Sequence, residues 1–321
     1  MITTNEVTGN DSDMRPHDPG LSRVAVAESV GPVYGFLAYG GHFMTMIRGA
    51  AAAVTGAANG IGRALALQLA ARGCDLALAD RDETGLKAVA AEIGGHTKVS
   101  VHKLDVGEPG QIADFAQAAT SAHRKLNILV NNAGVALVGH FHEVEQAQMD
   151  WLFNINFWGT VHAARAFLPH LSRQAEAHIV NLSSIFGIIA PPGQTAYSAS
   201  KFAVRGFSEG LRHELQMANS PVRISVVHPG GIATDIVRNA RTGAHISDHN
   251  ARRDEAIERF ALAARTSPEA AASRIIEGIE KNRLRILIGN DARFVDLVQR
   301  LRPASYWAPL ARQLARIMKS K

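Results

Sequence analysis

Seven short apolar segments, separated by longer stretches with helical periodicity, constrain the fold of this chain more than any other feature. Each segment is nearly continuous in Ala, Val, Ile and Leu, which is typical of strands that are buried on both faces. Strands that alternate with helices over about 240 residues predict an α/β fold. We expect a doubly wound, seven-stranded parallel sheet in three α/β/α layers. The segments are residues 50–55, 75–80, 99–105, 127–131, 178–183, 223–228 and 284–288.

A glycine-rich turn follows the first of these segments. Residues 55–62 read TGAANGIG, and a helical pattern begins at residue 63. Such a turn presents free backbone N–H groups at the positive end of a helix, where a pyrophosphate binds, and glycine allows a close approach. A glycine-rich turn without a ligand is the alternative. The candidate cofactor contacts in the turn are Gly56, Asn59, Gly60, Ile61 and Gly62.

The second predicted strand ends in Asp80, eighteen residues after Gly62. A carboxylate at this position can accept hydrogen bonds from both hydroxyls of an adenosine ribose, and its charge repels a 2′-phosphate. Asp80 therefore favours NAD over NADP as the cofactor. NADP stays open, because Arg81 could meet a 2′-phosphate as well as stack on the adenine. Asp105 and Val106, at the end of the third segment, are candidates to border the adenine.

Residues that can carry chemistry follow the fourth and fifth segments. Tyr197 and Lys201 lie four positions apart, so they share one face of a helix, and a nearby cation lowers the pKa of a phenol. Tyr197 is therefore a candidate general acid or base near neutral pH. Ser184 follows the fifth segment, at the strand edge where side chains project into a ligand crevice. Small residues after the fourth segment would let a cofactor lie against that edge: Asn132, Ala133 and Gly134.

In this order and spacing, these residues resemble the classical short-chain dehydrogenase/reductase (SDR) family. The resemblance covers about residues 49–235 and implies a Rossmann-type fold. The matching features are TGAANGIG at 55–62, Asp80, NNAG at 131–134, Asn156, Ser184, Tyr197, Lys201, and HPG at 228–230 with Thr234.

The resemblance implies a role for each catalytic residue. Tyr197 would exchange a proton with the substrate oxygen, and Ser184 would orient that oxygen. Lys201 would hold the nicotinamide ribose and lower the pKa of Tyr197, while Asn156 would hold a water that links Lys201 to solvent. The loop after the sixth segment would grip the nicotinamide carboxamide. The implied cofactor contacts in that loop are Pro229, Gly230, Ile232 and Thr234, and Tyr197 and Lys201 would also contact the cofactor.

The implied activity is the NAD(P)-dependent interconversion of a secondary alcohol and a ketone by hydride transfer, a reaction of class EC 1.1.1. The apolar residues between 185 and 192 favour a bulky, steroid- or lipid-like small molecule as substrate. Two alternatives stay open: an epimerase or dehydratase on the same fold, and a non-enzymatic dinucleotide-binding redox sensor. The family's usual interface, on the helices that flank Tyr197, predicts a homodimer or homotetramer. The fourteen histidines show no metal-binding spacing, so no metal site is expected.

Three parts of the chain differ in composition. Residues 1–43 lack a periodic pattern and are rich in Gly, Pro, Asn, Asp and Ser, which predicts a poorly ordered extension. Residues 44–293 would form the Rossmann-fold catalytic domain, with a lid at about residues 236–266. Residues 294–321 alternate apolar residues with arginine and predict a basic amphipathic tail. Such a tail could lie on an anionic membrane or, as we favour, pack on the body or on a second subunit.

The net charge of +5 is unevenly distributed along the chain. Residues 1–43 hold five acids and two arginines (−3), and residues 281–321 hold ten Lys or Arg and two Asp (+8). The body between them is neutral, so nucleic acid is not an expected partner. We find neither a secretory signal nor an apolar run of about 18 residues, and the single cysteine, Cys74, agrees with a reducing compartment. We therefore expect a cytoplasmic protein.

Overall fold

A sheet of seven strands lies at the centre of the described part of the chain, in the order β3-β2-β1-β4-β6-β7-β9, and adjacent strands are parallel. The computed structural model describes residues 44–319 apart from residue 96, so the extension expected at residues 1–43 lies outside the described residues. The predicted α/β fold and its seven-stranded parallel sheet are confirmed. The strands are β1 (Ala51–Thr55), β2 (Asp75–Asp80), β3 (Val99–Lys103), β4 (Leu126–Asn131), β6 (Ala177–Leu182), β7 (Val222–Pro229) and β9 (Arg285–Ile288).

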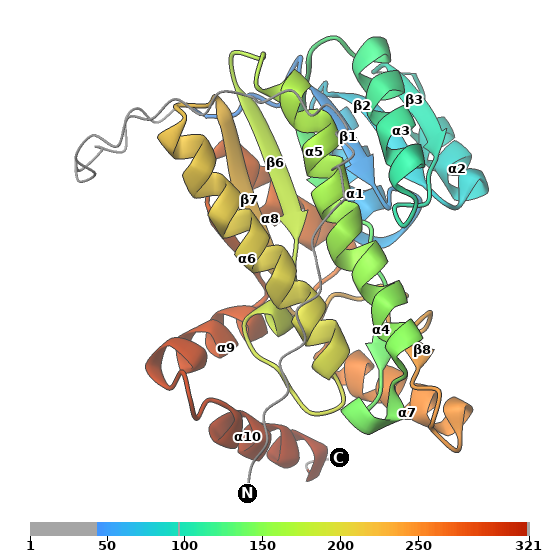
Figure 1. Ribbon diagram of the computed structural model, residues 1–321, viewed down its shortest axis with the longest axis vertical. Helices are drawn as coiled ribbons and strands as arrows, with labels where there is room; N and C mark the ends of the chain where they lie inside the picture. Colours follow the sequence, from blue (N-terminus) through green and yellow to red (C-terminus); the bar gives the residue numbers. More distant parts are fainter. Residues whose placement is uncertain (1–43, 96, 320–321) are drawn as a thin grey trace, which may run out of the picture. The chain divides into compact units, whose positions relative to one another are not determined.

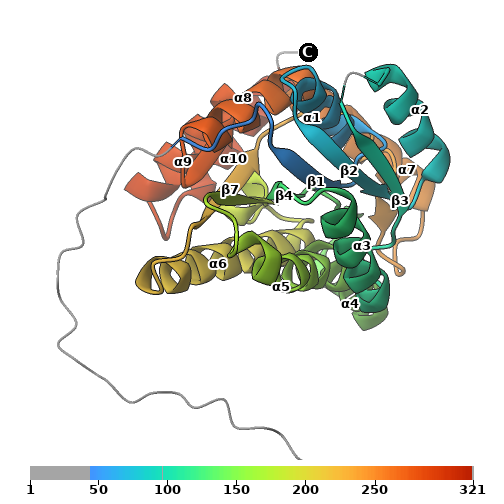
Figure 2. The same cartoon turned by 90° about the horizontal axis from the view of Figure 1, so that it is seen from above.

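Helices cover both faces of this sheet (Figure 2). One face is covered by α1 (Gly60–Ala70), α2 (Glu83–Ile93) and α8 (Pro268–Glu280). The other is covered by α3 (Pro109–Ala122), α5 (Gly159–Leu171) and α6 (Thr195–Met217). Four more helices lie toward the carboxyl ends of the strands (Figure 1): α4 (Gln146–Phe153), α7 (His249–Ala263), α9 (Asn290–Leu301) and α10 (Trp307–Lys319).

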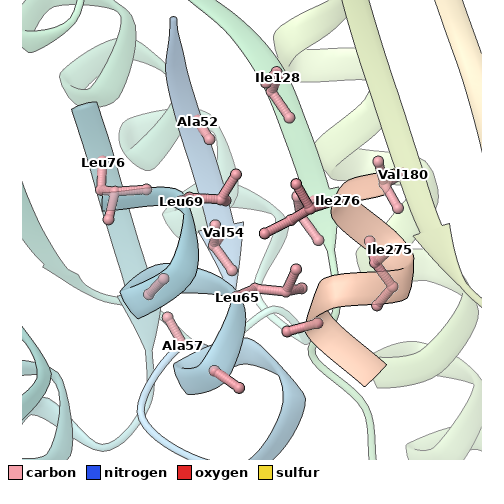
Figure 3. Packing of buried hydrophobic residues seen from close by; sticks show 14 of the residues in the cluster. Ala52, Val54, Ala57, Leu65, Leu69, Leu76, Ile128, Val180, Ile275 and Ile276 are labelled. Atoms are coloured by element: carbon pink, nitrogen blue, oxygen red, sulfur yellow. The ribbon is translucent and has the colours of Figure 1, made fainter. Parts of the chain in front are cut away.

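Alternate residues of the central strands supply the two hydrophobic cores. On one face, Val54 of β1 packs with Leu65 of α1 and Ile276 of α8 (Figure 3). On the other face, alanines of β1 and β2 leave room for Phe115 of α3 and Phe167 of α5, whose rings meet edge to face with centroids 5.4 Å apart. Because such cores are packed as densely as organic crystals, α1 is fixed against the sheet. Its N-terminus is thereby held at the carboxyl end of β1.

The order of the strands reverses between β1 and β4. The chain proceeds outward through β2 and β3 on one side of β1, and from β4 through β6, β7 and β9 on the other. In open parallel sheets a ligand binds in the crevice outside the carboxyl ends of the strands, at this point of reversal. The topology therefore predicts a ligand site at the loops that follow β1, β4 and β6.

The structure moves the start of one helix and shows two features that the sequence prediction did not contain. α1 begins at Gly60, three residues before the predicted start, because glycine has no side chain that could show helical periodicity. The predicted lid contains α7 and a short strand, β8 (Arg241–Thr242), which pairs with β5 (Leu137–Val138) in a second sheet. Residues Asn154–Trp158 form a π-helical turn between α4 and α5.

The C-terminal helices pack on the segment that follows β6. Leu310 of α10 and Val295 of α9 are buried together with Ile188 and Ile189. The backbone N–H of Ala190 also donates a hydrogen bond to the phenol oxygen of Tyr306 at 3.1 Å. Across residues 44–319, apart from residue 96, we find no helix with the length and hydrophobicity needed to span a bilayer.

Candidate active site

The glycine turn between β1 and α1 has a backbone that only glycine accommodates easily. Gly56 has φ +66° and Gly60 has φ +52°, in the left-handed region that side chains disfavour. A Cβ atom at Gly62 would lie 1.9 Å from the carbonyl oxygen of Gly56, so the first turn of the helix is closed against the loop. Asn59 is exposed at the N-cap and makes no side-chain cap, and Ile61 is half-buried. The N-terminus of α1 is therefore presented to the crevice.

Asn132 fixes this turn to the end of β4. Its side-chain Nδ2 donates to the carbonyl oxygens of Thr55 and Gly56, at 2.9 Å each. The Thr55 hydroxyl in turn accepts from the backbone N–H groups of Asn132 and Ala133, at 3.1 Å each. These four bonds cross the point where the strand order reverses. The segment after β4 is thereby locked beside the glycine turn.

Asp80 connects the end of β2 to the same turn. Its Oδ2 accepts from the backbone N–H of Ala58 at 3.0 Å, and its Oδ1 accepts from that of Asp82 at 3.1 Å. The carboxylate is half-buried, whereas the neighbouring Arg81 side chain is exposed. Asp80 is thus oriented by backbone donors beside the loop, and Arg81 is free to face solvent or a ligand.

Asp105 and Val106 lie one loop further along the edge. The Asp105 side chain is exposed, and its Oδ1 accepts from the backbone N–H of Gly107 at 2.8 Å. Val106 is buried against Gly159, where a Cβ atom would meet the Val106 carbonyl oxygen at 2.9 Å. The loop after β3 is therefore packed on the end of the π-helical turn.

Asn156 is buried within that π-helical turn, a type of helix distortion often found at functional sites. Its Oδ1 accepts from the backbone N–H of Val135 at 2.8 Å, and its Nδ2 donates to the Val135 carbonyl at 3.0 Å. Nδ2 also lies 3.1 Å from the Ser200 hydroxyl oxygen. A Cβ atom at Gly134 would lie 3.2 Å from Asn156 Oδ1 and 3.3 Å from Lys201 Nζ. Gly134 thus lets the amide and the ammonium approach the same point.

Tyr197, Lys201 and Ser184 lie together at the carboxyl end of β6. Tyr197 and Lys201 occupy the first turns of α6, and the Lys201 ammonium lies 5.8 Å from the centre of the Tyr197 ring. Lys201 also donates to the carbonyl oxygen of Leu182 at 3.1 Å. Ser184 caps a short 3₁₀ turn, with its hydroxyl accepting from the backbone N–H of Phe186 at 3.1 Å. The Ser184 side chain lies close enough to the Tyr197 phenol to lower its pKa.

The protonation of this group is set mainly by burial. Burial raises the pKa of the Tyr197 phenol to about 12, and the interaction with Ser184 opposes this rise. Tyr197 is therefore protonated at neutral pH. Burial also lowers the pKa of Lys201 to about 8, because the cost of withdrawing a charge from water dominates. The expectation that Lys201 lowers the pKa of Tyr197 stays a prediction.

The loop after β7 contacts the glycine turn. Gly230 follows Pro229, the last residue of β7, and its backbone N–H donates to the carbonyl oxygen of Ile288 at 2.9 Å. Ile232 is buried and forms a bridge with Thr266. Thr234 lies against the turn, since a Cβ atom at Gly60 would meet its methyl group at 3.1 Å. This contact brings the loop to the N-terminus of α1.

Two side chains beside the site have roles that the sequence did not predict. The ring of Phe186 meets the Tyr197 ring edge to face, with centroids 6.2 Å apart. His228 is fully buried, and its side chain contacts the Ser184 backbone. The HPG motif includes His228 but does not predict this contact. The apolar segment 185–192 is also less open than expected, because Ile188 and Ile189 pack on the C-terminal helices.

Comparison with known proteins gives consistent matches. The short chain dehydrogenase family profile matches residues 50–245. A Mycobacterium tuberculosis protein named as an oxidoreductase, SadH, is 40% identical over 274 residues, which are 85% of this chain and 98% of that protein. A short-chain dehydrogenase/reductase from Burkholderia phymatum, solved in complex with NAD, superposes with a TM-score of 0.72 at 30% identity, covering 80% of this chain and 94% of that one.

A metagenomic short-chain oxidoreductase, solved in complex with NADP, superposes with a TM-score of 0.59 at 28% identity, covering 75% of this chain and 97% of that one. The two solved relatives thus bind different nicotinamide dinucleotides. The fold, the glycine turn and these matches show that the chain belongs to the short-chain dehydrogenase/reductase family of NAD(P)-dependent oxidoreductases.

Proposed function

We propose that this oxidoreductase interconverts a secondary alcohol and a ketone, with Tyr197 as the proton-transfer group. The observation that carries the proposal is that the Ser184 side chain lies close enough to the Tyr197 phenol to affect its pKa, with the Lys201 ammonium on the same face of α6. A phenol and a hydroxyl placed side by side can both meet one substrate oxygen. This arrangement suits a reaction in which negative charge develops on that oxygen.

The residues around the crevice fit a nicotinamide dinucleotide. The N-terminus of α1 has no side-chain cap, and Gly56 and Gly62 let the turn close tightly against itself and against Asn132. The glycine turn would hold the pyrophosphate, while residues 132–134 and Thr234 would border the nicotinamide half. When bound, the dinucleotide supplies or accepts the hydride.

The protein's own residues then orient the substrate oxygen and transfer the proton. In ketone reduction, Tyr197 Oη donates its proton to the substrate oxygen, and the Ser184 hydroxyl orients that oxygen. The phenol is protonated at neutral pH, which suits this direction. Lys201, with a pKa of about 8, can hold a proton close to the phenol. Asn156 lies beside Lys201 at Gly134 and would position the water that reconnects the ammonium with solvent.

We propose NAD as the preferred cofactor, on the basis of Asp80. The carboxylate is oriented by the backbone N–H groups of Ala58 and Asp82, so it is held at the loop. A fixed negative charge accepts from ribose hydroxyls and disfavours a 2′-phosphate. The exposed Arg81 side chain is the feature that would favour NADP.

A bulky apolar alcohol or ketone is the proposed substrate class. Phe186 and Ile185 remain partly exposed beside Tyr197, even though Ile188 and Ile189 are covered. Oligomers are proposed to form through α5 and α6. Trp158, next to α5, is 47% exposed, and Phe202 of α6 is 39% exposed, which supports an apolar interface there.

The proposal is tested with a panel of secondary alcohols and ketones, using NAD(H) and NADP(H), on the native chain and on Tyr197→Phe. General acid–base catalysis contributes about 10²–10⁴-fold, so kcat of the variant should fall by that factor while dinucleotide binding persists. Tyr306→Phe is the matched control and should stay within a few-fold of the native rate. Undiminished turnover by Tyr197→Phe would refute the mechanism. Dinucleotide binding without turnover of any substrate would favour a redox sensor, and turnover without net oxidation or reduction would favour an epimerase or dehydratase.

A further inference from the structure

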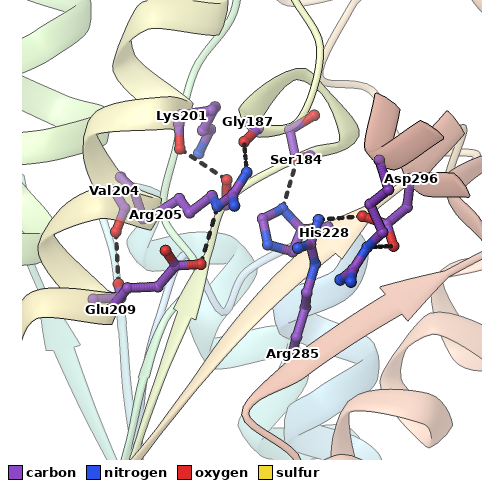
Figure 4. Close-up of polar contacts among 12 residues, drawn as sticks. Ser184, Gly187, Lys201, Val204, Arg205, Glu209, His228, Arg285 and Asp296 are labelled. Atoms are coloured by element: carbon purple, nitrogen blue, oxygen red, sulfur yellow. Dashed lines mark hydrogen bonds and ion pairs between the residues drawn. The ribbon is translucent and has the colours of Figure 1, made fainter. Parts of the chain in front are cut away.

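His228 lies near the end of β7, and its imidazole is fully buried. Its Nδ1 is 2.9 Å from the carbonyl oxygen of Ser184 (Figure 4). A carbonyl oxygen only accepts hydrogen bonds, so Nδ1 must carry the proton and donate it. Among the described residues, Nε2 has no hydrogen-bond partner, so the bond to Ser184 is the one that orients the ring.

Charged side chains from three elements surround this imidazole. Arg205 and Glu209 of α6 form an ion pair at 3.0 Å, and Arg285 of β9 pairs with Asp296 of α9 (Figure 4). Burial, with a smaller contribution from the two arginines, lowers the pKa of His228 to about 4. The imidazole is therefore neutral at physiological pH and donates through Nδ1 alone.

The contact reaches the Ser184 carbonyl, whose other hydrogen bond comes from within its own turn. This carbonyl also accepts from the backbone N–H of Gly187 at 2.9 Å, and the Ser184 hydroxyl accepts from that of Phe186 at 3.1 Å. Both donors belong to the short turn that Ser184 begins. His228 belongs to β7, so its bond links the start of this turn to the sheet, one residue beyond the backbone bond that Ser183 N–H donates to β7.

We propose that His228 is a positioning residue, whose Nδ1–H fixes the Ser184 peptide so that the Ser184 hydroxyl is held against Tyr197. The inference rests on the proposed function, in which Ser184 orients the substrate oxygen. His228 itself does not reach the substrate, since it lies behind the Ser184 backbone. A displacement of about 1 Å in a reacting group can cost roughly a hundredfold in rate. The loss of His228 should therefore be seen in kcat.

The test compares His228→Asn with His228→Leu. The two side chains have nearly the same shape and leave a similar cavity, but only Asn offers an N–H near the position of Nδ1. We expect kcat of His228→Leu to fall about ten- to a hundredfold, and His228→Asn to recover most of that loss. KM for the substrate and Kd for NADH should differ between the two by less than about twofold, because binding does not require the Ser184 geometry.

A second buried histidine supplies the control. His178 of β6 is also fully buried and hydrogen-bonded, to Thr45 and Ser225. His178→Asn and His178→Leu should lower the melting temperature without a difference in kcat between them. If the His228 pair behaves in the same way, the residue is structural and the proposal is wrong.

Crystal structures of the two His228 variants give a readout that does not depend on turnover. The position of the Ser184 hydroxyl beside the Tyr197 phenol should be kept in His228→Asn and shifted in His228→Leu. An unmoved Ser184 in His228→Leu would overturn the proposal. If Ser184 moves as expected but the native chain turns over no substrate, the positioning role stands and the proposed reaction fails.

Discussion

The carboxylate of Asp80 accepts a hydrogen bond from the backbone N–H of Ala58, 3.0 Å away in the glycine turn. A second bond, from the N–H of Asp82, orients the other oxygen. The residue proposed to select the cofactor is thus also the residue that ties the end of β2 to the loop. Cofactor choice and loop geometry are therefore coupled through one side chain.

Asp80→Asn should reduce the preference for NAD. The amide keeps one acceptor oxygen but loses the charge, and hydrogen bonds to charged groups contribute about 1.5–3 kcal/mol. NADH affinity should fall by about tenfold or more, while NADPH affinity falls less or rises. Fluorescence titration with both dinucleotides measures the ratio. An unchanged ratio of the two dissociation constants would contradict the assignment.

Arg81→Ala separates the two roles open to this exposed arginine. If the guanidinium meets a 2′-phosphate, only NADPH binding should weaken. If it stacks on the adenine, both dinucleotides should lose affinity by a similar factor. We expect the second result, because Asp80 is proposed to lie beside the ribose, and the same titrations decide between them.

Gly62→Ala should damage the dinucleotide site. The new Cβ would lie 1.9 Å from the carbonyl oxygen of Gly56, and this contact is with backbone that cannot rotate away. Overpacking of this kind costs about 1–3 kcal/mol or more, and the displaced loop should weaken NADH binding at least about tenfold. The free energy of unfolding and the NADH dissociation constant are the quantities to measure.

Gly206→Ala is the matched control for this substitution. Gly206 lies inside α6, and a Cβ atom there would meet nothing within 4 Å. Alanine is favoured over glycine in a helix by about 1 kcal/mol, so this variant should be as stable as the native chain or more stable. Equal losses in both variants would show that the Gly62 effect is not specific to the turn.

The strands could be predicted from the sequence because each is a buried apolar run, and buried parallel strands leave that signal. Other elements carry no such signal. β5 and β8 are two residues each and pair across more than one hundred positions of sequence, so only tertiary contacts define them. The π-helical turn at Asn154–Trp158 likewise differs from an α-helix by one inserted residue, which periodicity does not reveal.

The candidate site, too, could be predicted from the sequence only in part. Sequence order placed Ser184 after a strand and put Tyr197 and Lys201 on one helix face. It did not reveal how deeply Tyr197 is buried, and this burial raises the pKa of the phenol. Burial is the sum of contacts from many elements. The tail that covers Ile188 lies more than one hundred residues away in the chain. The local sequence at residues 185–192 therefore cannot predict that this segment is covered.

Acid should destabilise the protein through His178. Burial lowers its pKa to about 3, whereas the unfolded chain has the ordinary value of about 6.5. Between these values only the unfolded state binds the proton, so the free energy of unfolding falls as the pH falls, by up to about 1.4 kcal/mol per pH unit. His228 adds a similar slope from about 6.5 down to about 4.

His178→Gln tests this assignment, since the amide can still hydrogen-bond but does not titrate in this range. Urea denaturation at several pH values should show the slope between about pH 6 and pH 4 reduced by roughly half relative to the native chain. The variant should be less stable at neutral pH, which is a separate packing effect. A slope equal to that of the native chain would show that other groups cause the acid sensitivity.

Lys201 should give a pH dependence of the same sign at the alkaline side, where stability again rises with pH. Its folded-state pKa is about 8, and the unfolded value is about 10.4, so between them only the unfolded state keeps the proton. The free energy of unfolding should therefore rise from about pH 8 to pH 10, by up to about 1.4 kcal/mol per pH unit. Below pH 8 the protein carries the full cost of a buried ammonium. Tyr197 opposes this trend only above about pH 10, where the unfolded phenol loses its proton first.

Lys201→Met removes the buried charge and keeps most of the side-chain volume. We expect the variant to be more stable than the native chain near neutral pH, with a flat profile between about pH 8 and pH 10, and to have lost most of its activity. Urea denaturation and turnover, measured on the same preparations, test both parts. If Lys201→Met is less stable at neutral pH, the bond from the ammonium to the Leu182 carbonyl stabilises the fold more than burial of the charge costs it.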